Sequence, residues 1–154
     1  KDLYLSGGVY LGGTVAANYL DDYEEGTWTP VVKGNSSVGT TTYSANGQKG
    51  GYTKIGNSVS LTFYISWTAM TGTGSLLITG MPFALAGNTS NDVSAGNCMT
   101  SDLDIPNGTN NLTLVGTHGD TYLRIFSSID AGGIQQVQCD AGGATVWGQL
   151  TYRT

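Results

Sequence analysis

The sequence predicts an all-β protein, in which a jelly-roll-like β-sandwich follows a short N-terminal strand and helix. Apolar and polar residues alternate in several stretches with the period of two that is typical of strands. Glycine-rich turns separate these stretches at intervals of about eight to twelve residues, as in sandwiches and jelly rolls. Only 11% of the 154 residues are charged, and Glu occurs twice and Lys four times. Residues that favour exposed helix surfaces are therefore scarce, which argues against a mostly helical fold.

Residues 1–30 form the first of two predicted segments, a junction made of a short strand and a short helix. Apolar residues at odd positions between 3 and 11 predict the strand, which ends at a glycine pair. Thr14 is placed to cap a helix that runs through Tyr23. The apolar stripe of this helix, with residues spaced four apart, consists of Val15, Tyr19 and Tyr23. This stripe is too narrow to stand alone and needs a partner surface.

Residues 31–154 form the second segment, the β-sandwich domain. Its clearest strand runs from Ile55 to Trp67, where apolar residues at odd positions from 59 onward alternate with Ser, Thr and Tyr. Shorter strands are predicted over Leu76–Ile78, Leu112–Thr117, Thr121–Phe126, Ile134–Cys139 and Thr145–Tyr152. The second and third of these form a hairpin. We assign Trp28 and Trp67 to the core.

The composition limits the partners and the redox chemistry of the chain. The net charge is −5, and six cations spread along the sequence make no basic patch, so nucleic acid and anionic membrane surfaces are disfavoured partners. No apolar run approaches the ~18 residues of a membrane span, so we expect no membrane insertion. Cys98 and Cys139 form either one disulfide or two buried free thiols. Because the sequence begins with Lys1, we expect a piece of a longer polypeptide.

Motifs for catalysis and metal binding are absent from the sequence. His118 is the only histidine, and no G-x-S-x-G, H-E-x-x-H or C-x-x-C pattern occurs. Four acidic residues lie close together at the end of the predicted helix. They are Asp21, Asp22, Glu24 and Glu25. We interpret this acidic cluster as structural, because acid–base catalysis needs carboxylates at a defined separation across a cleft. The sequence therefore predicts no enzyme, no cofactor and no metal site.

Three stretches of the sequence resemble a family of phage tail-fibre and tailspike proteins. The first is LGGTVAANYLDDYEEGTWTP, residues 11–30, which is similar to a motif at the start of a distal C-terminal β-domain in that family. The second is GGYTKIGNSVSLTFYISW, residues 50–67, which resembles the strand that follows. The third is the terminal ATVWGQLTYRT, residues 144–154, which resembles an ending of such domains.

The resemblance implies a homotrimeric receptor-binding tip at the distal end of a phage tail fibre or tailspike, carried on upstream fibre domains. Such a tip is made in the host cytoplasm and acts outside the cell, as part of the virion. It attaches to a host cell-surface glycan or an outer-membrane protein. In this interpretation Val15, Tyr19 and Tyr23 meet their symmetry copies around a three-fold axis. The alternative is that this stripe packs on the chain's own sandwich.

Two other functions compete with attachment. One is a structural trimerisation or folding cap that has no receptor site of its own. The other is a glycan-cleaving enzyme, which requires two carboxylates facing each other about 5–10 Å apart. The sequence offers no convincing pair of that kind.

Aromatic residues supply the candidates for receptor binding. The chain has nine Tyr and three Trp, whose rings combine a large apolar face with a polar tip and therefore suit partly wet binding surfaces. A sugar ring can rest on such a face while neighbouring polar side chains bind its hydroxyls. The residues predicted to contact a receptor or glycan are Tyr64, His118, Asp120, Tyr122, Arg124 and Trp147. The alternative for each aromatic residue is a place in the core or in the trimer interface.

Overall fold

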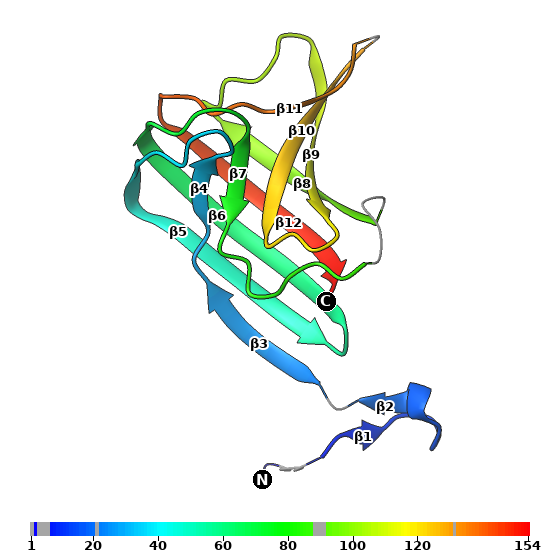
Figure 1. Cartoon of the computed structure of the whole chain (residues 1–154). Helices are drawn as coiled ribbons and strands as arrows, with labels where there is room; N and C mark the ends of the chain where they lie inside the picture. Colours follow the sequence, from blue (N-terminus) through cyan, green and yellow to red (C-terminus); the bar gives the residue numbers. More distant parts are fainter. Residues whose placement is uncertain (1, 3–6, 21, 88–91, 131) are drawn as a thin grey trace.

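Strands make up almost all of the regular structure in the computed structural model, which describes residues 2, 7–20, 22–87, 92–130 and 132–154 (Figure 1). A small sheet pairs β1 (Val9–Tyr10) with β2 (Tyr19–Leu20). The ten strands of the large sheet are β3 (Tyr23–Trp28), β4 (Val31–Gly34), β5 (Thr41–Ile55), β6 (Ser58–Met70), β7 (Leu76–Thr79), β8 (Val93–Ser101), β9 (Thr109–Thr117), β10 (Tyr122–Ile129), β11 (Gly133–Gln136) and β12 (Ala144–Arg153).

The large sheet is antiparallel and curls into a half-barrel, so the predicted all-β class is confirmed (Figure 1). Its strands follow the order β3-β5-β6-β12-β8-β9-β10-β7-β4, and β11 pairs with β10. The predicted sandwich of two separate sheets is replaced by one sheet. Because β12 pairs with β6 along one edge and with β8 along the other, hydrogen bonding continues where a sandwich would divide.

Side-chain hydrogen bonds hold the curl near the edge strand β4, which packs beside β5 although the two strands are not paired. The Val32 N–H donates to the Tyr43 hydroxyl at 3.0 Å. The Gln48 side-chain amide donates to the Pro30 carbonyl at 2.9 Å. Both partners on β5 flank a register shift in the β5–β6 ladder, and such irregularities bend a strand and increase its twist.

The predicted helix from Thr14 to Tyr23 is wrong. Among the described residues of this range, only Ala16–Asn18 are helical, in a single 3₁₀ turn. Tyr19 instead begins β2, where its ring lies 4.8 Å from that of Tyr10 on β1. Tyr23 begins β3, which pairs with β5 over six residues. Cross-strand pairing therefore prevails over a four-residue spacing that also fits a helix, because aromatic residues favour strands. Of the predicted N-terminal strand, residues 3–6 lie outside the described residues, and within residues 7–11 only Val9–Tyr10 form a strand.

The strands predicted in residues 31–154 are confirmed, with shifted ends. The apolar alternation from residue 59 to residue 67 places all five apolar side chains of β6 in the core. Ile55 belongs to the preceding strand, and Gly56 and Asn57 form the turn between β5 and β6. Trp28 and Trp67 are buried, as predicted. The indole N–H of Trp67 has no hydrogen-bond partner among the described residues.

On the concave side of the sheet, large aromatic rings lie over glycines of neighbouring strands. Trp28 lies over Gly50, its pairing partner on β5. Phe63 on β6 lies over Gly148 on β12 in the same way. A Cβ atom at either glycine would come closer than 3.0 Å to the ring, a separation that real Cβ atoms essentially never show. The curled sheet therefore fits its core by pairing large and small residues across strands.

Gly50 and its neighbour Gly51 provide a matched test of this packing. We expect Gly50→Ala to destabilise the fold by about 1–3 kcal/mol, the usual cost of overpacking a core. Gly51→Ala is expected to be neutral or stabilising, because its Cβ would approach no atom closer than 3.5 Å and because glycine inside a strand costs entropy. Urea unfolding of both variants tests the prediction. Equal unfolding midpoints would contradict it.

Candidate functional site

The candidate site lies on the outer face of the sheet, where side chains of β5, β6, β12 and β8 point away from the core. Strand pairing arranges these side chains in rows that run across the strands. The aromatic row consists of Lys49, Tyr64, Trp147 and Met99. The polar row consists of Gly51, Thr62, Gln149 and Asn97. A third row, of Thr53, Ser60 and Thr151, continues to Glu25 on β3.

The aromatic row brings together two of the predicted receptor-binding residues. The rings of Tyr64 and Trp147 have centroids 5.7 Å apart and are tilted by 49°. Trp147 is 38% exposed and the neighbouring Met99 is 61% exposed. Tyr64, Trp147 and Met99 therefore present an apolar surface to solvent, and the exposed Lys49 lies at the β5 end of the row. The period-two pattern predicted that Tyr64 and Trp147 point outward, but not that they are neighbours.

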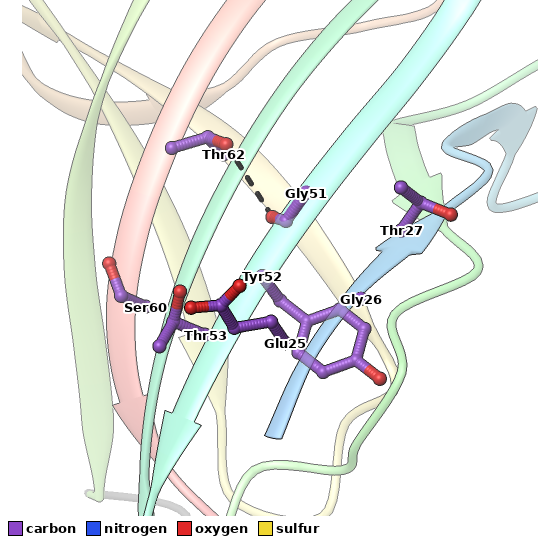
Figure 2. Close-up of a pocket in the computed structure, with 8 residues that line it drawn as sticks. All are labelled: Glu25, Gly26, Thr27, Gly51, Tyr52, Thr53, Ser60 and Thr62. Carbon is purple, nitrogen blue, oxygen red and sulfur yellow. Dashed lines mark hydrogen bonds between the residues drawn. The ribbon is translucent and has the colours of Figure 1, made fainter. Parts of the chain in front are cut away.

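Next to the aromatic row, small and polar residues leave the outer face shallowly hollowed. One hollow of about 520 Å³ is lined by residues of β3, β5 and β6 (Figure 2). In it the Thr62 hydroxyl donates a hydrogen bond to the Gly51 carbonyl at 3.5 Å. Three further hollows adjoin it, because each shares Ser60 or Thr62 with it. Two of these hollows also share Asn97 and Gln149 with each other. We call the combined depression the trough; its residues are Glu25, Gly51, Thr53, Ser60, Thr62, Asn97, Gln149 and Thr151.

Five polar side chains of the trough have no hydrogen-bond partner within the described part of the chain. They are Thr53, Ser60, Asn97, Gln149 and Thr151. Hydroxyl and amide groups of this kind both donate and accept hydrogen bonds. Because they project from paired strands, their positions are fixed by the sheet. None of the five is among the residues predicted to contact a receptor, although the polar positions of the alternation in β6 and β12 were a usable signal.

The other predicted receptor-binding residues lie in the hairpin between β9 and β10, where Asp120, Tyr122 and Arg124 contact one another. Arg124 donates to the Asp120 carboxylate at 2.8 Å and to the Tyr122 hydroxyl at 2.6 Å. Its guanidinium group also lies 4.7 Å from the centre of the Tyr122 ring. Burial raises the pKa of the Tyr122 hydroxyl. His118 is exposed at the turn. The Arg124 guanidinium group therefore stabilises the hairpin through these contacts.

The described members of the acidic cluster each have a partner on a neighbouring strand or residue. Asp22 forms an ion pair with the mostly buried Lys54 of β5. Glu24 accepts a hydrogen bond from the Tyr52 hydroxyl. Glu25 accepts one from Tyr23, and its carboxylate also borders the trough (Figure 2). Asp21 lies outside the described residues. The contacts of Asp22 and Glu24 join the start of β3 to β5, as a structural role of the cluster requires.

The residues predicted for the trimer interface are exposed in the single chain. Val15 is 64% exposed, Tyr19 39% and Tyr23 58%. They do not form a helical stripe, because Tyr19 lies on β2 and Tyr23 begins β3. Figure 1 shows β1 and β2 beyond the start of β3, away from the large sheet. An isolated two-stranded sheet is only marginally stable in water, so these apolar side chains lack a core of their own.

The described residues offer neither a metal-binding cluster nor a membrane-spanning helix. They contain no group of three or more His, Cys, Asp or Glu side chains placed to hold a metal ion. No helix among them is long and apolar enough to cross a membrane. Comparisons with protein-family models, with curated proteins and with solved structures found no match.

Cys98 and Cys139 are free thiols, which settles the alternative that the sequence left open. Cys98 on β8 pairs with Gly148 and packs against the core. Burial raises the pKa of its thiol from 9.0 to about 11. Since the thiolate is the reactive form, Cys98 is held in its unreactive state at neutral pH.

We expect Cys98 in the folded chain to react with iodoacetamide at pH 9 roughly 50-fold more slowly than in urea, because far less of it is thiolate. The unfolded chain releases this proton first, so the contribution of Cys98 to stability is lost as the pH rises from 9 towards 11. Peptide mass spectrometry after timed labelling measures the first effect, and urea unfolding at each pH measures the second. Equal labelling rates with and without urea would refute the assignment.

Proposed function

We propose that this chain is the distal receptor-binding domain of a phage tail fibre or tailspike, and that it attaches the virion to a glycan or protein on the host cell surface. The half-barrel serves as the tip of the fibre. The observation that carries the proposal is the pair formed by Tyr64 and Trp147, which lies partly exposed beside unpartnered polar side chains. The phage-like stretches of the sequence add support that is independent of this geometry.

Attachment fits the outer face better than catalysis does. Hydrolysis of a glycan requires two carboxyl groups placed on opposite sides of the bond to be cleaved. Among the trough residues only Glu25 carries a carboxylate, and it already accepts a hydrogen bond from Tyr23. A shallow surface with an apolar platform and neutral polar groups suits reversible binding instead.

The proposed assembly is a homotrimer joined to upstream fibre domains. Its support is the exposure of Val15, of Tyr19 in the small β1–β2 sheet and of Tyr23 at the start of β3. Contact with two other copies would remove these side chains from water. Three equivalent tips on one fibre also gain avidity, because the binding of one tip raises the effective concentration of the others at the surface.

The same N-terminal exposure also favours a second function, a trimerisation or folding cap without a receptor site. A cap needs the β1–β2 sheet and the start of β3, but it does not need the aromatic row. The two functions therefore differ in what they predict for a substitution of Trp147.

We expect the purified chain to compete with the phage that carries this tip for its host cells. Trp147→Ala should weaken the competition at least tenfold, because a lost aromatic anchor typically costs 1.4 kcal/mol or more. The concentration of chain that halves plaque formation measures the effect. Ile134→Ala is the matched control, because this exposed apolar residue lies on β11. Undiminished competition by Trp147→Ala would reject the aromatic row, and absence of competition by the unaltered chain would favour the cap.

Light scattering tests the assembly separately. We expect a mass of about three times the 16.0 kDa of the single chain. Replacing the exposed Val15 and Tyr19 with Asp should shift the chain towards monomer, because unpaired carboxylates are costly to bury. A monomeric unaltered chain at high concentration would exclude the trimer formed by this segment.

A further inference from the structure

We propose that the trough binds an extended, uncharged oligosaccharide that runs across the strands from β3 towards β8 along the edge of the aromatic row. This inference rests on the proposed attachment function and names the class of receptor. It excludes acidic polysaccharides and host proteins as the main ligand of this face.

The dimensions of the trough suit a chain of sugar rings rather than a single one. It extends over five neighbouring strands, β3, β5, β6, β12 and β8. With neighbouring strands about 4.8 Å apart, these span roughly 19 Å. The hollows along this path share lining residues, so they adjoin one another and one extended ligand can contact several of them.

The groups in the trough match the surface of a neutral sugar. A sugar ring has apolar C–H faces and an edge of hydroxyl groups that donate and accept hydrogen bonds. Trp147 and Tyr64 offer the apolar platform. Directly beside them on the same strands, Gln149 and Thr62 offer amide and hydroxyl groups of both polarities. The juxtaposition of a ring platform with unpartnered donors and acceptors is what recognition of a sugar requires.

The charge of this face favours an uncharged ligand. The part of the trough on β6, β12 and β8 is lined by Ser, Thr, Asn and Gln and contains no charged side chain. The charged residues that border the face are Glu25 on β3, Lys49 on β5 and Arg153 on β12, and the two cations lie in rows on opposite sides of the trough. The chain as a whole carries −5. A polyanion in the trough would therefore meet only the two separated cations at its borders, and the net negative charge of the molecule would oppose its binding.

The composition of the face also argues against a protein partner. In the aromatic and polar rows, the exposed apolar side chains are those of Trp147 and Met99, and Tyr64 is half-buried. Stable protein interfaces need a fully buried apolar centre within about 800 Å² on each side. A short apolar row beside a hydroxyl-rich hollow provides less than that.

Gly51 keeps the trough open. It faces outward from β5, and a Cβ atom added there would meet Thr62 at 3.5 Å and nothing closer. A larger side chain at this position would stand in the trough without entering the core. Valine is suitable, because β-branched residues favour strands.

The experiment uses the whole chain and bacterial polysaccharide as the probe. A fluorescent chain is first screened against a panel of bacterial strains to find one that it stains. Polysaccharide from that strain is then separated by anion exchange into an uncharged and an acidic pool, and each pool competes with the cells for the chain. We expect the uncharged pool to compete and the acidic pool not to. The inference also requires staining to survive protease treatment of the cells.

Three variants connect the result to the trough. Gly51→Val and Gln149→Ala should each weaken binding to the uncharged pool at least tenfold. Gln135→Ala should leave it unchanged, because Gln135 is an exposed glutamine on β11 whose known contact uses its backbone carbonyl. Urea unfolding and light scattering verify that the variants keep the fold and the assembly. If Gly51→Val does not fold, Gln149→Ala decides the matter.

The outcomes separate the inference from the function on which it rests. Staining that only the acidic pool inhibits, or that protease abolishes, would overturn the uncharged oligosaccharide and leave attachment standing. Undiminished staining by both Gly51→Val and Gln149→Ala would move the receptor site away from the trough. Failure of the unaltered chain to stain any strain would count against attachment itself, and the trough inference would fall with it.

Discussion

The packing of aromatic rings over glycines on the concave side of the sheet is the constraint on which the structure depends. When a sheet curls, its inner side chains converge, so large residues cannot face one another on every pair of strands. Trp28 lies over Gly50, and Phe63 lies over Gly148. Tyr52 lies over Gly26 in the same way. The 24 glycines of the chain are therefore not only turn residues, since several make room for the core.

The same constraint shapes the outer face. Gly50 and Gly51 are neighbours, so they point to opposite sides of β5. The first makes room for a buried indole, and the second leaves the outer face hollow. With the bulky residues committed to the core, the outer side of β5, β6 and β12 holds mostly small hydroxyl and amide side chains, interrupted by Tyr64 and Trp147. The same alternation of side chains along β5, β6 and β12 thus places the core on the inner face of the sheet and the candidate site on its outer face.

Local patterns in the sequence predicted what depends on one strand, and long-range pairing decided the rest. The alternation along β6 predicted its buried face, because a half-buried strand repeats every two residues. No local pattern shows that Trp147 lies beside Tyr64, which is 83 residues earlier in the chain. The spacing of Val15, Tyr19 and Tyr23 fits a helix by itself and failed, because pairing with β1 and β5 lay outside the local pattern.

On the proposed function, a neutral, shallow site has a physical consequence for attachment to a bacterium. The chain is acidic, and at physiological salt charge effects decay over about 8 Å. Long-range attraction therefore contributes little to its encounter with a negatively charged cell surface. Binding through ring stacking and neutral hydrogen bonds acts only at contact and changes little with salt. On the proposed function, many copies of such a site together hold a virion. A copy that dissociates rebinds its receptor quickly, because its bound neighbours keep it at a high effective concentration near the surface.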